Sequence, residues 1–370
     1  MNTMRLYNPE FAYIYSFSDF VQFQMVLKYY GKSNLAIAVN ASSGAAHFLQ
    51  PDHIIDVDYN GTSYPFIIKR IVLDNDILTV QAVSPHELFE RRITIPPDGS
   101  YAVTGSGTPD KVVKDFIRGC ISGGRSLPVR VAADQTDGAR ISDTSRLKNL
   151  GDEVSRVCAA HGIGEVFTLD TVNGVFVFDT FSGADRTSSN TDNNAPCVFA
   201  EKYKNLVDHK YDYDTSGIVT TAIVAGAGEG EEREFLTVGN DVTGLDRYET
   251  LVDARDVAQG NTALLAERGT AKLIGASEAV ATTENQAGNL IFGEDYFLGD
   301  LVTVRFPVPN YTYHDSYYDM SAQMLQVDQR VSEVTVSIEG GAEHIDIKYG
   351  ELILTKSENM RRDLNRLMAT

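Results

Sequence analysis

The sequence contains no tryptophan and only three cysteines, which stand far apart at Cys120, Cys158 and Cys197. No two of them have the short spacing that a zinc site needs, and an odd number does not make a disulfide framework. Two of the three fall on the apolar faces of predicted helices. We therefore expect buried, reduced thiols.

Long apolar runs are also missing. The stretch from Gly217 to Gly228 is too short for a membrane helix and is interrupted by threonines. The N-terminal residues Met1 to Arg5 include no hydrophobic region, so we expect no secretion signal. These absences predict a chain made in the cytoplasm and no membrane segment.

Basic residues are scarce, since 32 Lys and Arg face 51 Asp and Glu and the net charge is −19. Such a surface repels phosphate backbones, so the composition argues against specific nucleic-acid binding. Two interpretations of the charge stay open. It is either an ordinary soluble surface or the lining of an acidic passage through which DNA slides without sticking.

The sequence contains few residue patterns that are typical of catalytic, metal-binding or cofactor-binding sites. The seven histidines stand alone, and no serine lies in a Gly-x-Ser-x-Gly elbow. The glycine-rich segment 226–230 lacks the Lys-Ser/Thr pair of a phosphate-binding loop. Asp212 and Asp214 begin as a calcium loop does, but its twelfth position is Ile223 instead of an acid. We therefore predict no catalytic, cofactor-binding or metal-binding residues, no cofactor and no enzymatic activity.

Hydrophobic periodicity divides the chain into regions. Strand patterns in an antiparallel, barrel-like or sandwich unit fill residues 1–95, with a hairpin turn at Asn60-Gly61. Residues 96–200 predict a small α+β domain. Strands return in 201–355, around a helical insertion near 258–288, and 356–370 predicts a C-terminal helix. The fold class is mainly β with an α+β part.

The middle region carries the clearest helix signals. Thr108 followed by Pro109 is typical of a helix start, with threonine as N-cap and proline at the first helical position. A second helix is expected from about Ser145 to His161, with Gly162 at its C-terminal cap. Asn173-Gly174 predicts a hairpin after it.

A weak internal repeat links the first and last thirds of the chain. Pro51-Asp52 precedes an apolar strand and Gly299-Asp300 precedes another, and each is followed by a strand with an arginine, Arg70 or Arg330. The second copy has 12 more residues between its aspartate and its arginine, because 330 − 300 exceeds 70 − 52 by that number. Two related β domains are therefore plausible.

The extra residues coincide with a tyrosine-rich stretch, Pro307 to Met320. We expect Pro307 and Pro309 to disrupt strand pairing there, which makes the stretch an exposed loop. Exposed tyrosines are enriched in interfaces, although a solvated loop without a partner stays an alternative. The candidate interface residues are Tyr311, Tyr313, Tyr317 and Tyr318.

Several segments together resemble the siphovirus and prophage tail proteins of baseplate-hub type. They occur in the family's order over about residues 4–350, and two of them are the most specific, 244–256 (GLDRYETLVDARD) and 296–304 (YFLGDLVTV). The other segments are 4–9 (MRLYNP), 29–35 (YYGKSNL), 88–93 (LFERRI), the helix before 162–164 (GIG), 183–187 (GADRT) and 196–200 (PCVFA).

This resemblance implies a homotrimer with two tube-like β-barrel domains per chain, so that three chains present six similar units to a six-fold tail tube. It implies a structural protein of the virion tail tip that connects the tail tube to the tip. The implied partners are the tail tube or distal tail protein, the tape-measure protein and a tip or spike protein. A receptor- or glycan-binding tail protein is the alternative, since clustered tyrosines suit sugars. The gene neighbourhood would separate the two.

Overall fold

The computed structural model describes residues 3–96, 99–136, 138–206, 209–214, 216–275, 277–282, 290–309, 313–314, 317–318 and 322–350. Most of the secondary structure of the described residues is β-strand, which confirms the mainly β class. The chain divides into a larger unit, Met1–Lys210 with Ala281–Thr370, and a smaller unit, Tyr211–Val280. Among the described residues, no helix is long and apolar enough to cross a membrane.

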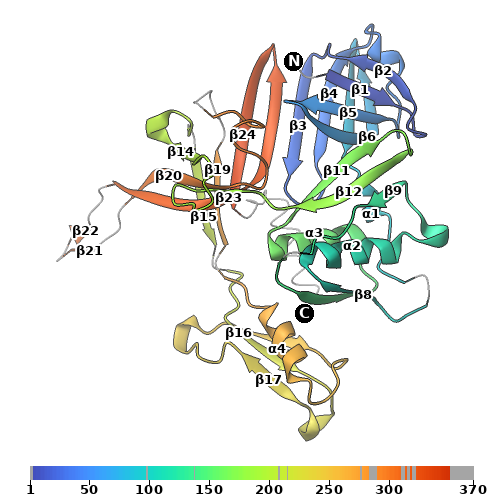
Figure 1. The fold of residues 1–370 in the computed structure, drawn as a ribbon. Coiled ribbons are helices and arrows are strands. Elements are labelled where there is room, and N and C mark those ends of the chain that lie inside the picture. The colour runs from blue at the N-terminus through green and yellow to red at the C-terminus, as the bar shows by residue number, and fades with distance from the viewer. Residues whose placement is uncertain are drawn as a thin grey trace. The chain divides into compact units, whose positions relative to one another are not determined.

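The larger unit is built on a long, open sheet with the strand order β24-β23-β3-β4-β7-β6-β5-β1-β2 (Figure 1). Strand β20 also pairs with β23, and β13 and β14 run parallel to β20. No closed barrel is formed by the described strands, so the two-barrel layout stays a prediction. The strands are β1 (Thr3–Tyr7), β2 (Tyr13–Phe17), β3 (Gln22–Lys28), β4 (Asn34–Asn40), β5 (Ile54–Tyr59), β6 (Thr62–Asp74), β7 (Ile77–Val83), β13 (Asp185–Arg186), β14 (Val198–Ala200), β20 (Leu301–Pro309), β23 (Ala322–Glu339) and β24 (Ala342–Gly350).

An α+β section follows β7 in the same unit. Two amphipathic helices pack against the three-stranded sheet β11-β12-β9, and valine, phenylalanine and cysteine side chains fill the space between them (Figure 1). Its elements are α1 (Glu87–Glu90), β8 (Val103–Gly107), α2 (Pro109–Cys120), β9 (Val129–Val131), β10 (Ile141–Ser145), α3 (Leu150–His161), β11 (Gly164–Asp170) and β12 (Val175–Phe181).

The helix signals of this section are confirmed. Thr108 caps α2 by accepting a hydrogen bond from the N–H of Lys111, and Gly162 ends α3 with φ +63°. Helix α3 starts at Leu150, five residues later than expected, because Ser145 belongs to β10 and Asn149 is the N-cap. Cys120, Cys158 and Cys197 are buried free thiols.

The smaller unit has its own core. Helix α4 packs on a three-stranded sheet of order β17-β16-β18, around Val224, Val252 and Leu265. Helix α4 lies within the range 258–288, where a helical insertion is expected, and the same range also contains a strand. The elements are β16 (Thr221–Ala225), β17 (Phe235–Val238), β18 (Glu249–Asp253) and α4 (Thr262–Thr270), while β15 (His209–Asp214) and β19 (Ser277–Thr282) lie at the boundaries of the two units. The predicted C-terminal helix, 356–370, lies outside the described residues.

The internal repeat has a counterpart in strand pairing. Strand β6 pairs with β5 through its first half and with β7 through its second half, and the register shifts by one residue between Ile68 and Arg70. Strand β23 pairs with β20 and then with β24 in the same way, with a shift between Val331 and Glu333. A two-residue turn joins each long strand to the next strand. Residues 75–76 join β6 to β7, and residues 340–341 join β23 to β24. Two copies of one three-strand pattern therefore lie in the larger unit.

The expectation that Pro307 and Pro309 interrupt pairing was wrong, because β20 continues through Pro309, which pairs with Ala322. The N–H of Leu301 donates to Ala184, just before β13, and the N–H of Thr303 donates to Cys197, just before β14, so odd residues of β20 direct their nitrogen atoms away from β23. The nitrogen atoms of Pro307 and Pro309 also point away from β23. Strand β14 ends opposite Arg305, so it does not reach either proline. No ladder hydrogen bond is lost at either proline.

Candidate functional site

Tyr29, directly after β3, is the point where three segments of the larger unit meet. Its side chain is fully buried. Its hydroxyl oxygen lies 2.9 Å from the carbonyl oxygen of Gly162 and 3.2 Å from that of Phe181, and it accepts a bond from the N–H of Gly183. Burial raises the pKa of Tyr29, so the hydroxyl stays a proton donor. One side chain thereby joins the first β strands to the α+β section.

The tyrosine ring requires glycine on its other side. Gly299 has φ +89°, and a Cβ there would lie 2.2 Å from Cε2 of Tyr29. A Cβ on Gly183 would lie 1.9 Å from the carbonyl oxygen of Gly299. Both distances are far inside van der Waals contact, so only glycine fits at either position. The two backbone segments can therefore touch each other and the ring.

Arg330 of β23 closes the junction. Its Nη1 donates to the carbonyl oxygen of Gly299 at 2.5 Å, and its guanidinium carbon lies 5.3 Å from the centre of the Tyr29 ring. A guanidinium at this distance from an aromatic ring interacts favourably with its π electrons. The arginine of the second sequence repeat thus holds the turn that starts β20.

Asp300 fixes the segment 184–186, which pairs with the start of β20. The side chain is buried, and its two oxygen atoms accept bonds from the N–H of Ala184 (2.8 Å), the N–H of Phe297 (2.9 Å) and Nε of Arg186 (2.8 Å). The bond from the N–H of Phe297 closes the turn that precedes β20. The contacts with Ala184 and Arg186 join two segments that are more than a hundred residues apart.

A buried ion pair makes a second link between the first β strands and the α+β section. Nδ1 of His86 lies 2.6 Å from Oε2 of Glu165, and Oε1 of Glu165 accepts a bond from the N–H of Gly31 at 2.8 Å. Burial alone would lower the pKa of His86, but the charge and hydrogen bond of Glu165, together with Glu90, raise it above the ordinary value. Sequence reasoning treated His86 as an isolated histidine, since its partner lies 79 positions away.

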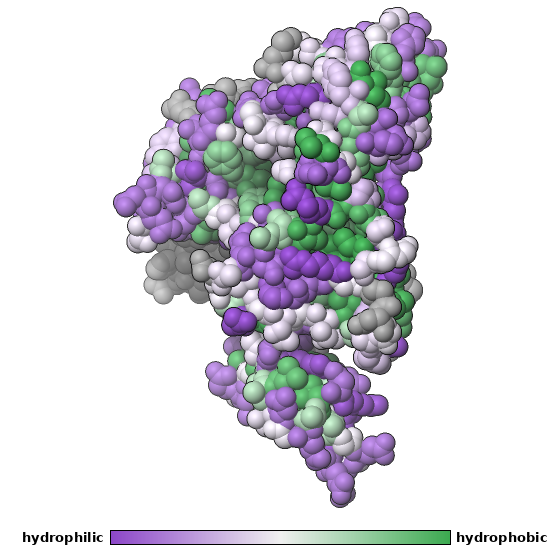
Figure 2. All heavy atoms as spheres, turned by 45° about the vertical axis from the view of Figure 1, so that its right-hand side comes forward, coloured by the Kyte–Doolittle hydropathy of each residue, from purple (hydrophilic) through white to green (hydrophobic). Residues whose placement is uncertain are grey.

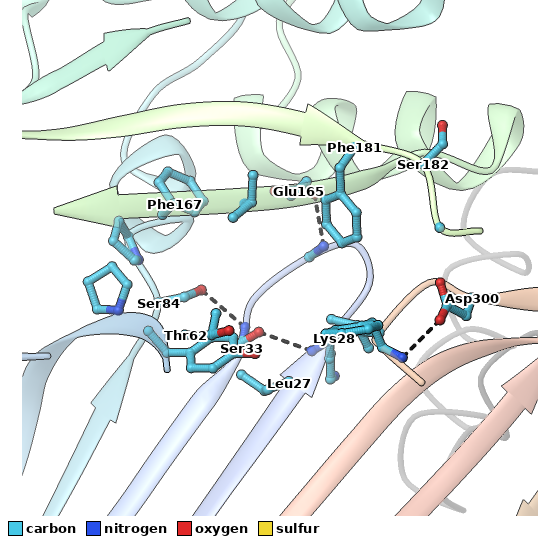
Figure 3. Close-up of a pocket in the computed structure, with 18 of the residues that line it drawn as sticks. Leu27, Lys28, Ser33, Thr62, Ser84, Glu165, Phe167, Phe181, Ser182 and Asp300 are labelled. Atoms are coloured by element: carbon cyan, nitrogen blue, oxygen red, sulfur yellow. Dashed lines mark hydrogen bonds between the residues drawn. The ribbon is translucent and has the colours of Figure 1, made fainter. Parts of the chain in front are cut away.

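A cavity of about 520 Å³ lies between these links (Figure 3). Its walls come from β3 and the following loop, from β6, from β11 and β12, and from the turn before β20, and they are mainly apolar. The charged groups at its edge are already engaged: Glu165 with His86 and Gly31, Asp300 with Arg186, and Lys28 with Glu333. These charged groups of the lining therefore bind one another, backbone groups or charged side chains behind the wall.

The predicted interface tyrosines lie elsewhere. Tyr311 is outside the described residues. Tyr313 belongs to β21 (Tyr313–His314), which pairs with β22 (Tyr317–Tyr318). These two short strands lie beyond the end of the β20–β23 hairpin (Figure 1). The role of Tyr311, Tyr313, Tyr317 and Tyr318 as an interface stays a prediction.

The segment 244–256, in the smaller unit, forms local ion pairs. Arg247 bonds to Glu249 at 2.7 Å, and Asp253 contacts Arg233 and Arg255 at 2.7 and 3.4 Å. Most of these groups are exposed, and such pairs contribute little to stability. Apolar side chains also reach the surface of this unit, among them Leu245, which is 95% exposed (Figure 2).

Solved structures of tail proteins share this fold. The 43 kDa tail protein of prophage MuSo2 from Shewanella oneidensis aligns over 94% of this chain and 98% of its own, with a TM-score of 0.53 and 12% identity. The tail protein from Neisseria meningitidis MC58 covers 95% and 96%, with 0.55 and 11%. The prophage tail protein gp18 from Listeria monocytogenes EGD-e covers 100% of both chains, with 0.54 and 11%. At these identities the similarity concerns the fold.

The sequence itself matches a family. The model of the siphovirus ReqiPepy6 Gp37-like protein family covers residues 3–351, and the chain therefore belongs to this family. No curated protein sequence matches it significantly. Membership confirms the resemblance to siphovirus tail proteins that the ordered segments indicated.

Proposed function

We propose that this protein is a structural hub of a phage or prophage tail tip, which trimerises and connects the tail tube to the tip. The observation that carries the proposal is the repeat of one strand pattern, β5-β6-β7 and β20-β23-β24, within a single chain. Three such chains present six similar units, and a six-fold tube can rest on them. Family membership and the fold of prophage tail proteins support the same conclusion.

The proposal defines the partners. One face of the trimer contacts the tail tube or distal tail protein, and the other holds a tip or spike protein. The tape-measure protein ends at the lumen. The acidic composition, with 51 acidic against 32 basic residues, lets DNA pass without binding. The location is the virion tail tip.

The Tyr29 junction is the internal frame of this hub. Tyr29, Asp300 and the His86–Glu165 pair fasten the α+β section to both copies of the strand pattern. These bonds stabilise the frame more than exposed pairs would, because removal of either partner leaves a buried polar group unsatisfied. We expect no turnover of peptidoglycan or polysaccharide. Hydrolysis of labelled cell walls, abolished by one carboxylate substitution in this chain, would refute that expectation.

Native mass spectrometry of the purified protein, alone and with its tail partners, tests the proposal. We expect the mass of three chains of 40.6 kDa each. Detection of labelled protein at the tail tip of intact virions is the second readout. A monomer or a two-fold dimer under both conditions, or a position along the fibres, would exclude the hub.

A further inference from the structure

One edge of the second half of β6 has no neighbouring strand among the residues that the structure describes. Before the register shift, Ile68 exchanges hydrogen bonds with His53 and Asp52, so even residues of β6 face β5. After the shift, Asp74 pairs with Ile77 across a two-residue turn, so even residues face β7. Ile71 and Leu73 therefore direct their N–H and C=O groups to the side of β5, beyond the point where that strand begins. No described strand pairs with them there.

The same edge is occupied in the second copy of the pattern. Strand β3 pairs with β23 from Glu333 to Glu339, and the N–H of Tyr29 extends the pairing to the carbonyl oxygen of Ser332 at 2.9 Å. Strands β24 and β3 lie on opposite sides of β23. Strand β3 thus occupies on β23 the position that stays open on β6.

Burial follows this difference. The register shifts align Arg70 with Glu333, and hence Leu73 with Val336. Val334 and Val336 are completely buried, whereas Ile71 and Leu73, which align with them, are half-buried and 63% exposed. An apolar strand with free backbone groups is a template for pairing with another chain.

We propose that this edge of β6, residues 70–74, receives strand β15 of a second copy of the chain, in the manner in which β23 receives β3 within one chain. The inference rests on the proposed trimer and names the contact that closes it. Strand β15 is the candidate because of sheet order. In the first pattern the order is β3-β4-β7-β6, and in the second it is β15-β19-β24-β23, so β15 corresponds to β3.

Charges are complementary in this pairing. Lys28, the last residue of β3, lies 3.9 Å from Glu333. The residue that corresponds to Glu333 is Arg70, and the last residue of β15 is Asp214. The Asp214–Arg70 pair has the charges of the Lys28–Glu333 pair in reverse, so the two side chains still attract each other.

The contact is heterologous, since β6 and β15 are different surfaces of the chain. Such a contact builds a ring when its rotation closes. With two similar units per chain, alternating β3–β23 pairs within chains and β15–β6 pairs between chains give six equivalent seams around three copies.

Engineered cysteines test the seam directly. Val72 and Asp212 are opposite each other in the proposed register, at a pair without mutual hydrogen bonds, where Cβ atoms are close enough for a disulfide. The single variants Val72→Cys and Asp212→Cys are purified, mixed in the presence of the tail partners and oxidised. We expect a covalent dimer in the mixture and none with either variant alone. The double variant in one chain should give covalent trimers.

A matched control lies inside the chain. Val26 and Thr335 are Cα partners of β3 and β23 and correspond to Asp212 and Val72. Val26→Cys with Thr335→Cys should form a disulfide within one chain and leave the mass unchanged. Suppose that the control disulfide forms and native mass spectrometry shows a trimer, but the two single variants do not crosslink. The proposed β6–β15 contact is then wrong, while the proposed hub function stands. If no trimer exists in any condition, the proposed function and the seam both fall.

Charge exchange gives an independent readout. Arg70→Asp should weaken association of the chains about tenfold, and Asp214→Arg in the same chain should restore it, because the opposite charges face each other again. Equal weakening in the single and the double variant would overturn the register.

Discussion

The two copies of the strand pattern differ in what surrounds them. Strands β5 and β6 are joined by the two-residue turn Asn60-Gly61, while β20 and β23 are joined by the 12 residues between Pro309 and Ala322. Strand β3 pairs with the long strand β23, while no strand among the described residues pairs with the matching edge of β6. The comparison indicates that a common scaffold was kept and that contacts to other parts were added to one copy.

The starts of the two patterns differ as well. Asp52 is 64% exposed and pairs with Lys69 at 3.0 Å. Asp300 is buried and accepts three hydrogen bonds, two of them from the distant segment 184–186. The second position is where the α+β section and both β patterns meet around Tyr29, and this junction requires a buried anion and close backbone contact.

The largest effect is expected at Gly299. Gly299→Ala places a Cβ 2.2 Å from Tyr29 at a positive φ, so backbone strain and overpacking act together. We expect a loss of about 4 kcal/mol in the free energy of unfolding, measured by chemical denaturation. Gly124→Ala, with no atom within 4 Å of the added Cβ, is the control and should change stability by less than about 0.5 kcal/mol. Equal effects at both positions would contradict the junction.

The aspartates separate the two copies most clearly. Asp300→Ala leaves Arg186 and two backbone N–H groups without their acceptor, and should cost about 3 kcal/mol. Asp52→Ala removes one exposed pair and should cost about 0.5 kcal/mol or less. Denaturation curves of both variants give the comparison. Similar losses would mean that the two turns are equivalent.

The His86–Glu165 pair should make stability depend on pH. Because the folded-state pKa of His86 lies above the ordinary 6.5, its contribution is fully present below pH 6.5 and is lost as the pH rises through the folded value. The denaturation midpoint should therefore fall over this window. His86→Gln should remove this part of the pH dependence. Parallel pH profiles of the two proteins would show that the pair does not carry it.

The smallest effect on stability is expected from the tyrosine-rich connection. Replacing residues 310–321 with Asn-Gly, as in the first copy, should change the free energy of unfolding by less than about 1 kcal/mol, because the β20–β23 pairing up to Pro309 and Ala322 remains. Tail assembly should fail if Tyr311, Tyr313, Tyr317 and Tyr318 form an interface. Normal assembly of infective tails would remove that role, and loss of folding would place the segment in the core.

The sequence predicted local features best. The cap at Thr108, the glycine after α3, the Asn60-Gly61 turn and the repeat each depend on a few neighbouring residues. The junction was not predicted, since Tyr29, Gly183 and Gly299 meet only through pairing of distant strands. Pro309 was misjudged because its effect depends on which edge of β20 its nitrogen faces, and periodicity does not contain that information.

Electron cryomicroscopy of the assembled protein, viewed along the ring axis, tests the central claim most directly. The account predicts three chains around one axis, with six similar β units and a continuous seam between neighbouring chains at residues 70–74. A ring of six chains, a two-fold dimer, or a trimer whose chains meet through other surfaces while the β6 edge faces solvent would contradict it.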